Sequence, residues 1–388
     1  MPGQISGIRE GSSRFPLYDR SVDGFEKYWY PALRSRDVGA KARSIALFGR
    51  DIVFLRDAGR VYAFDDRCPH RGVPLSFGKR EFPGTITCGY HGWTFDVKSG
   101  TLVAVLTDGP DSPICGKAHV RTYPVEERAG LVWIYNGTGT PPPVERDIPS
   151  EFLRSDAVIE GRITERAGDF RYAAENGFDE GHAKYLHRDA WMMFFARMPG
   201  FARVKVEPDE EQPWLTRNVT DVFFESQYPG VGSWPKRRFW KKARRGARLS
   251  IRMPGALRSN HVGKWMHFEW YVPAHAERHR YLQFVIARAT GLRALAFRTY
   301  YWTFLRWLFH VQFNNQDARM VESMKTPPEQ LYRPDISLVA WRHLCENALA
   351  AAESSAPAVL AAPEVLYAEQ EGEQFRLAAE RTEVSPNA

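Results

Sequence analysis

Two short stretches, Cys68-Pro-His70-Arg71-Gly72 and Cys88-Gly89-Tyr90-His91-Gly92-Trp93, decide most of what this chain can be. Together they offer two thiolates and two imidazoles, which can hold one tetrahedral zinc ion or a [2Fe–2S] cluster with two histidines on one iron. Zinc sites usually take their cysteines from one pair and their histidines from another. Here each stretch carries one cysteine and one histidine, so each can give one ligand to each of two irons. The spacing therefore favours the iron–sulfur cluster over zinc.

The composition is that of a globular protein with room for two domains. The chain has 388 residues, of which 44% are hydrophobic and 26% are charged. Residues 1–7 lack the apolar stretch of a signal peptide, and Cys115 and Cys345 are the cysteines left over beside the two loops. We therefore expect a cytoplasmic protein without a disulfide framework.

Basic residues give the chain a formal net charge of +7 and gather in two places. The run 236–246 has no nucleic-acid-binding motif beside it, so we expect no nucleic-acid partner. The second group surrounds the two loops and consists of Arg67, Arg71, Lys79, Arg80, Lys117 and Arg121. Long-range attraction toward such a surface suits an acidic electron carrier.

The order of apolar runs predicts an α+β fold, with a small all-β domain before a larger catalytic domain. Short apolar runs between turns predict strands at 44–48, 51–55, 61–64, 85–88, 93–96 and 131–135. The larger domain is expected to have an antiparallel sheet flanked by helices. Its predicted strands are 217–224, 249–253 and 265–272, and its predicted helices are 170–184, 292–324 and 336–350.

These elements suggest four segments along the chain. Residues 137–143 are rich in Gly and Pro and are expected to form a stiff linker. We expect an N-terminal segment at 1–44, the cluster domain at 45–143, the catalytic domain at 144–376 and a flexible tail at 377–388.

A second group of metal-binding side chains lies in the catalytic segment. His182 and His187 are five residues apart, so a regular helix would rotate them by about 140°, and they can converge only if the helix bends or ends between them. A carboxylate downstream would complete a 2-His-1-carboxylate site that leaves positions open on Fe(II). Asp317 is the best candidate, and Glu322 on the same helical stretch is the alternative.

The two motifs together resemble those of the Rieske non-haem iron oxygenases that hydroxylate aromatic rings, in their large (alpha) subunits. The resemblance implies that Cys68 and Cys88 bind one cluster iron and that His70 and His91 bind the other. It implies that His182, His187 and Asp317 bind a mononuclear Fe(II). Members of this family are trimers, and Asp179 matches the carboxylate that links a cluster histidine of one subunit to an iron histidine of its neighbour.

Several phrases are similar to the terminal oxygenases of the carbazole dioxygenase type, including Glu175-Asn-Gly-Phe-Asp179 and Phe268-Glu-Trp-Tyr-Val-Pro273. By that similarity the residues facing the substrate would be Gly177, Ala183, His267, Glu269, Phe313 and Asn314. The similarity is patchy between residues 188 and 262, and this chain has four residues between its iron histidines where those relatives have three. The sequence therefore does not identify the substrate.

The resemblance implies an oxygenase that uses O2 and electrons from a ferredoxin and an NAD(P)H-dependent reductase to dihydroxylate an apolar aromatic or heteroaromatic, carbazole-like substrate. The alternative within this class is monooxygenation: O- or N-demethylation, or hydroxylation of a steroid- or terpenoid-like compound. A pure electron-transfer protein would not need the second motif, and a zinc-stabilised interaction module would not be redox-active. The aromatic stretch Ala294–Phe313 contains Arg298 and Arg306, so it predicts a buried helix or one in weak contact with a membrane surface, not a spanning helix.

Overall fold

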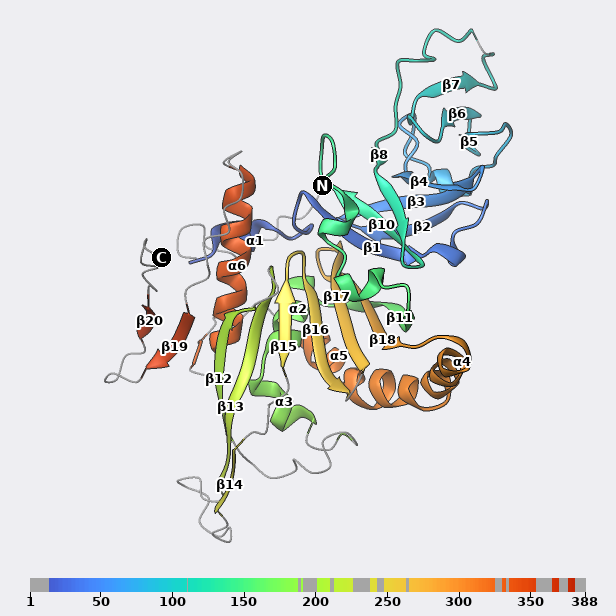
Figure 1. The fold of residues 1–388 in the computed structure, drawn as a ribbon. Helices are drawn as coiled ribbons and strands as arrows, with labels where there is room; N and C mark the ends of the chain where they lie inside the picture. The colour runs from blue at the N-terminus through green and yellow to red at the C-terminus, as the bar shows by residue number, and fades with distance from the viewer. Residues whose placement is uncertain are drawn as a thin grey trace, which may run out of the picture.

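The computed structural model describes residues 14–109, 111–187, 190, 201–209, 213–225, 238–242, 248–262, 265–324, 330–332, 335–353, 365–369 and 376–380. These residues form a small all-β domain and a larger domain of sheet and helices, as Figure 1 shows. The predicted fold class is confirmed.

The small domain contains three antiparallel sheets of short strands, with the orders β1-β10-β9, β2-β3-β4-β8 and β5-β6-β7. The strands are β1 (Tyr28–Arg34), β2 (Arg43–Leu47), β3 (Arg50–Asp57), β4 (Arg60–Asp65), β5 (Thr85–Thr87), β6 (Trp93–Asp96), β7 (Leu102–Val105), β8 (Thr122–Tyr123), β9 (Val125–Arg128) and β10 (Leu131–Asn136). All six predicted strands are present. The sequence did not reveal β1, which lies within the expected N-terminal segment but pairs with β10.

The described residues of the large domain form one antiparallel sheet of ten strands. Its order is β11-β18-β17-β16-β15-β13-β12-β19-β20, and β14 pairs with β13. The bounds are β11 (Ala157–Ala167), β12 (Phe201–Pro208), β13 (Leu215–Glu225), β14 (Arg238–Lys242), β15 (Leu249–Arg252), β16 (Ala256–Val262), β17 (Trp265–His275), β18 (Arg278–Arg288), β19 (Val365–Glu369) and β20 (Arg376–Glu380). The three predicted strands correspond to β13, β15 and β17.

The helices are α1 (Pro16–Arg20), α2 (Phe170–Phe178), α3 (Gly181–Leu186), α4 (Gly291–Tyr300), α5 (Asn314–Ser323) and α6 (Ile336–Glu353). Two π-helical turns, η7 (Tyr301–Leu305) and η8 (Leu308–Phe313), join α4 to α5. The predicted helices at 292–324 and 336–350 are confirmed, whereas the one predicted over 170–184 is divided into α2 and α3. None of the described helices has the length and apolarity that crossing a membrane requires.

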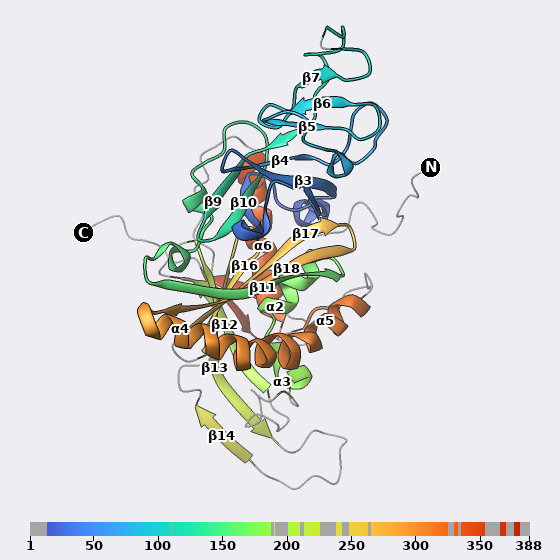
Figure 2. The ribbon, with the colours of Figure 1, turned by 90° about the vertical axis from the view of Figure 1, so that its right-hand side faces the viewer.

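Successive side chains on the large sheet point to opposite faces, so one face packs against the small domain and the other packs against the helices. On β18, Leu282 and Phe284 pack in one cluster with Trp133 of the small domain. Their neighbours Tyr281 and Val285 point to the other face and pack against the helices. The molecule therefore has three layers, with the small domain above the sheet and α2, α3, α4 and α5 below it in the view of Figure 2.

Two expectations fall largely outside the described residues. Of the basic run 236–246, residues 238–242 are described as the backbone of β14, and the rest lies outside. Of the expected flexible tail, residues 377–380 belong to β20 and residues 381–388 lie outside.

Candidate metal centres

The two cysteine–histidine loops have the same backbone hydrogen bonds at the same positions. The carbonyl of Cys68 accepts from the N–H of Gly72 at 2.8 Å, and that of Cys88 accepts from the N–H of Gly92 at 3.1 Å. The N–H of each cysteine donates to the carbonyl five positions later. Gly72 and Gly92 have φ angles of 77° and 68°, a region that strains other residues. The chain thus makes one kind of turn twice, and each turn presents one cysteine and one histidine.

Within these loops the thiols lie inside and the imidazoles lie at the surface. Cys68 and Cys88 are buried, His91 is half-buried and His70 is exposed, with the two imidazole centroids 4.6 Å apart. Burial raises the pKa of Cys68 to about 11, so a bound metal is needed to keep this thiol ionised at neutral pH. A single zinc ion would draw four ligands to one point. Two inner sulfurs and two outer nitrogens instead fit a [2Fe–2S] cluster with one iron held by each pair.

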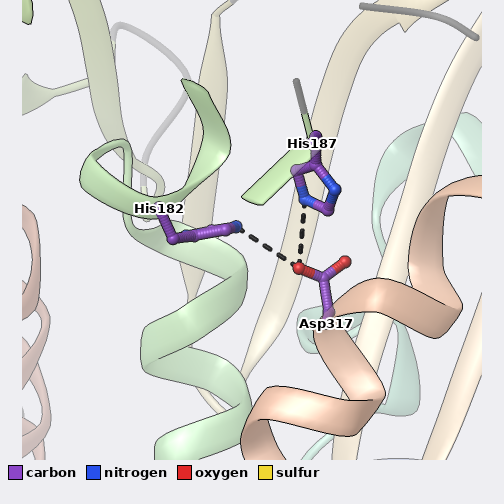
Figure 3. A group of neighbouring side chains, drawn as sticks. All are labelled: His182, His187 and Asp317. Atoms are coloured by element: carbon purple, nitrogen blue, oxygen red, sulfur yellow. Dashed lines mark ion pairs between the residues drawn. The ribbon is translucent and has the colours of Figure 1, made fainter. Parts of the chain in front are cut away.

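The break between α2 and α3 shapes the second site. Helix α3 ends at Leu186, so His187 lies just beyond it, with φ −90° and ψ 8°. The helix therefore ends between His182 and His187, as their convergence requires. Both imidazoles point toward Asp317 on α5 (Figure 3).

The geometry of this triad matches a mononuclear metal site. The Nε2 atoms of His182 and His187 lie 3.4 and 3.1 Å from Oδ1 of Asp317, and the three ligand atoms lie within 4.8 Å of one another. Metal–ligand bonds of about 2.1 Å fit this spacing. Nδ1 of His182 lies 3.0 Å from Asp179 Oδ2, and Nδ1 of His187 lies 2.9 Å from Gln316 Oε1. Because these partners engage Nδ1, Nε2 is the nitrogen left to bind a metal.

Charges in the site are arranged to receive a cation. Burial lowers the pKa of His182, but hydrogen bonds to Asp179 and Asp317 outweigh it and raise the pKa to about 9. Burial raises the pKa of Asp317, but hydrogen bonds from the two imidazoles lower it well below its usual range. A metal ion that replaces the proton on His182 would be attracted by the same Asp317 carboxylate. Glu322 is exposed on α5 and lies outside this group.

Asp179 lies in the turn between α2 and α3, and the sheet fixes the residues on both sides of it. Its carboxylate accepts from two backbone N–H groups at the start of α3, at 2.7 and 2.9 Å. Arg217 of β13, which is 3% exposed, donates to the carbonyl of Phe178 at 2.8 Å. The same guanidinium pairs with Glu180 at 2.8 Å. Asp179 therefore caps the turn and also holds the ring of His182.

Four of the residues expected to face the substrate lie next to the triad or on β17. Phe313 stacks on the ring of His187, with centroids 3.8 Å apart. Asn314 is buried, and its Nδ2 lies 3.5 Å from Oε1 of Glu269. Nε2 of His267 lies 3.7 Å from the same oxygen and has no hydrogen-bond partner among the described atoms. Burial lowers the pKa of His267, although Glu269 opposes the shift.

The other two expected residues lie on α2 and α3. Gly177 faces the side chain of Tyr271, whose hydroxyl donates to Glu269 at 2.7 Å. Ala183 follows His182 on α3 and is half-buried.

A buried polar network around Glu269 was missed by the sequence analysis. Gln283 donates from Nε2 to Glu269 at 3.3 Å, and the hydroxyl of Tyr281 donates to the same carboxylate. Nδ1 of His310 lies 3.1 Å from Oε1 of Gln283, and Nε2 lies 2.8 Å from the hydroxyl of Tyr301. Polar residues inside otherwise apolar strands were the available signal. Their partners come from β17, β18 and the π-helical turns, which no local pattern connects.

Two family profiles match the chain. Residues 28–124 match the Rieske [2Fe-2S] domain, and residues 135–351 match the homotrimeric ring hydroxylases. The chain belongs to this family of Rieske ring-hydroxylating oxygenases, so it is an oxidoreductase that takes a [2Fe–2S] cluster and a mononuclear iron.

The similar proteins include terminal oxygenase components of carbazole 1,9a-dioxygenase. The one from Sphingomonas sp is 32% identical over 380 residues, covering 89% of this chain and 98% of the relative. The one from Metapseudomonas resinovorans is 35% identical over 290 residues, covering 69% of this chain and 73% of the relative. A solved reduced complex between oxygenase and ferredoxin in carbazole 1,9a-dioxygenase matches with a TM-score of 0.72 at 29% identity, covering 84% of this chain and 90% of that chain. The predicted family is therefore confirmed.

Proposed function

We propose that the two sets of side chains are the ligands of the two metal centres of this oxygenase. In this proposal the cluster ligands are Cys68 and Cys88 on one iron and His70 and His91 on the other. The mononuclear iron ligands are His182, His187 and Asp317. The observation that carries the proposal is the convergence of both Nε2 atoms on Asp317, with each Nδ1 held by a second residue.

The protein groups around the triad position the ligands and exclude water. When bound, the cluster supplies single electrons, and the mononuclear iron supplies the point at which dioxygen and substrate react. Asp179 and Gln316 fix the tautomers of the two imidazoles. The ring of Phe313 covers His187. His267 is buried and neutral, and its Nε2 has no hydrogen-bond partner among the described atoms. This nitrogen can therefore orient a hydroxyl, carbonyl or N–H group of the substrate.

We further infer that an acidic ferredoxin, reduced by an NAD(P)H-dependent reductase, delivers the electrons. Exposed cations around the cluster loops support this partner: Arg67, Arg71, Lys79, Lys117 and Arg121. Arg80 instead pairs with Asp57. Tyr90 and Phe77 are exposed beside the same loops, which gives the surface an apolar centre within a charged rim. The solved oxygenase–ferredoxin complex of carbazole 1,9a-dioxygenase supports a ferredoxin as the partner.

In our proposal the chain forms a homotrimer in which Asp179 connects the cluster of one subunit to the iron of the next. The Asp179 side chain is 18% exposed while it holds the iron-side imidazole of His182, so one edge of it is accessible to a neighbour. Four large apolar residues are exposed on and near α3 and α5, and they can cover the contact: Tyr185, Met320, Met324 and Tyr332.

The substrate in this proposal is an apolar aromatic or heteroaromatic compound of the carbazole kind, and the product is a dihydroxylated ring. We also infer a cytoplasmic location, which the absence of disulfides among all four cysteines supports. We propose a cluster domain at 45–143 and a catalytic domain at 144–376. The two matched profiles, 28–124 and 135–351, leave residues 125–134 between them, just before the linker.

Single turnover of the reduced, anaerobically purified enzyme with ¹⁸O2 tests the reaction. A panel of fused aromatics and heterocycles, methoxy-aromatics and steroids is added, and the products are analysed by mass spectrometry. We expect two labelled oxygen atoms in the product of a carbazole-like ring. One labelled atom, or reaction confined to methoxy or steroid compounds, would assign the chain to monooxygenation instead.

Complementation between defective subunits tests the path through Asp179. Cys68→Ser removes a cluster ligand, Asp317→Ala removes an iron ligand, and each variant alone is expected to be inactive. Co-expression should restore about a quarter of the wild-type activity, because every mixed trimer has one cluster next to one working iron site. Adding Asp179→Asn to the Cys68→Ser chain, whose iron is the working one, should remove this activity, while Glu322→Gln in the same chain should not. Absence of complementation would place both metals of a working pair in one subunit.

A further inference from the structure

The helical stretch from Gly291 to Phe313 keeps one side buried along its whole length. Its buried apolar positions are Phe297, Tyr301, Leu305 and Phe309, each four residues after the last. On a regular α-helix of about 3.6 residues per turn, such positions drift by roughly 40° per step. The π-helical turns η7 and η8 take up the extra residues, so the four side chains stay on the sheet side. The opposite side consequently stays exposed along the stretch, and Figure 2 shows this long helix at the outside of the molecule.

This exposed side, which we call the outer face, is strongly apolar. Its large apolar members are Leu292, Leu295, Tyr300, Trp302, Trp307 and Val311. Leu292 is 84% exposed and Trp302 is 49% exposed, whereas Tyr300 and Trp307 pack on Phe304 at the edge of the core. Apolar groups gathered on one exposed helix mark a surface that is covered in use.

The charges and hydroxyls of the outer face are those of an interfacial helix. Residues 291–313 include three arginines and no aspartate or glutamate. The guanidinium of Arg306 lies 5.1 Å from the ring centroid of Trp302. Thr299 and Thr303 donate their hydroxyls to helix carbonyls at 3.1 and 2.8 Å, so these groups do not depend on water. Arg298 reaches Glu160 on β11 at 3.3 Å, at the edge of the helix.

We propose that the outer face binds the surface of an anionic lipid bilayer. Its leucines would enter the boundary of the acyl chains, its tryptophans would lie at the headgroups, and Arg293 and Arg306 would meet lipid phosphates. A second copy of the chain bound face to face suits this face less well, because an interface between two outer faces would bring these arginines against each other. A polar acidic protein would leave the six apolar side chains poorly covered.

The inner side of the same stretch contacts the proposed catalytic site. Phe309 stacks on His267 with centroids 5.4 Å apart, and Phe313 stacks on His187. A bilayer on the outer face would therefore hold apolar substrate close to the site. This consequence rests on the proposed function, whereas the binding itself does not.

Vesicle binding by the purified holoenzyme tests the proposal without turnover. Co-sedimentation is measured with vesicles of phosphatidylcholine and with vesicles of equal parts phosphatidylcholine and phosphatidylglycerol. We expect binding to the anionic vesicles, with about fivefold weaker binding for each of Arg293→Gln and Arg306→Gln. Trp302→Gln combined with Trp307→Gln should weaken binding at least tenfold, and Leu292→Gln with Leu295→Gln should do likewise.

The matched control is Phe82→Gln, since Phe82 is 49% exposed like Trp302 but lies in the small domain. The visible spectrum of the cluster verifies that each variant is folded and loaded. Equal binding to both vesicle types, or anionic binding that survives the tryptophan and leucine changes, would overturn the proposal. Loss of the wild-type oligomeric state in the tryptophan variant would assign the outer face to a contact between copies, which would also overturn it.

Discussion

We predict that replacing Gly177 with alanine destabilises the protein, even though alanine is the better helix former. Gly177 lies in the last turn of α2, and a Cβ atom there would lie 2.3 Å from the hydroxyl oxygen of Tyr271 and 2.9 Å from its Cζ. Tyr271 has little freedom to withdraw. It is 5% exposed, its ring is stacked on Tyr281 with centroids 5.0 Å apart, and its hydroxyl donates to the buried Glu269.

Two opposing effects set the size of the change. Alanine in place of glycine contributes up to about 1 kcal/mol to helix stability. Overpacking a rigid site costs about 1–3 kcal/mol, and loss of a hydrogen bond to a charged group costs about 1.5–3 kcal/mol. The steric effect therefore wins, and we expect Gly177→Ala to lower the free energy of unfolding by about 2 kcal/mol.

Urea unfolding at equilibrium measures this change, with Gly39→Ala as the control because no atom lies within 4 Å of a Cβ at Gly39. The control should stay within about 0.5 kcal/mol of the wild type. In a Tyr271→Phe background the cost of Gly177→Ala should shrink, since the closest atom has been removed. A Gly177→Ala protein as stable as the wild type, or a cost that Tyr271→Phe does not reduce, would refute the steric argument.

Two further predictions concern the mononuclear site. Asp317→Ala should lose the mononuclear iron while keeping the visible spectrum of the cluster, and Glu322→Ala should keep both. The iron content per cluster measures this. The reverse pattern would assign the iron ligand to Glu322. Because the pKa of His182 is raised to about 9 and a metal binds the neutral imidazole, proton competition should weaken metal binding below that pH. The affinity of the iron-free site for Fe(II), titrated anaerobically, should therefore rise from neutral pH to about pH 9 and then level off. In Asp179→Asn the affinity should level off at a lower pH. An affinity that does not change with pH would contradict this explanation.

The candidate cluster ligands could be recognised in the sequence because each loop carries its own cysteine, histidine and glycine. Cys68 and Gly72 are neighbours in the chain, and their hydrogen bond closes a turn that needs no distant partner. The same holds for Cys88 and Gly92. Each turn is therefore local, and the spacing favoured a [2Fe–2S] cluster over zinc, in agreement with the matched Rieske domain.

The carboxylate of the triad could not be settled in the same way. Asp317 and Glu322 are five residues apart on α5, so they lie on different sides of it. Which side faces α3 depends on how the helix packs, and the π-helical turns before α5 influence that rotation. The network from Glu269 to Tyr301 was missed for a related reason, since its members come from different strands and turns that meet only in the folded chain.

In the proposed trimer Asp179 serves two partners, and the fold supports it for that role. A carboxylate near the surface would usually be mobile, but its own turn and the sheet both restrict this one. The turn supplies two backbone N–H groups, and Arg217 fixes the residues before and after it by binding the carbonyl of Phe178 and the carboxylate of Glu180. Because Arg217 belongs to β13 and is almost fully buried, the position of Asp179 is tied to the sheet rather than to α3 alone. If the proposed trimer forms, a helix terminus anchored in this way holds one carboxylate at a constant distance from His182 and from the neighbouring subunit, as electron transfer between two metal centres requires.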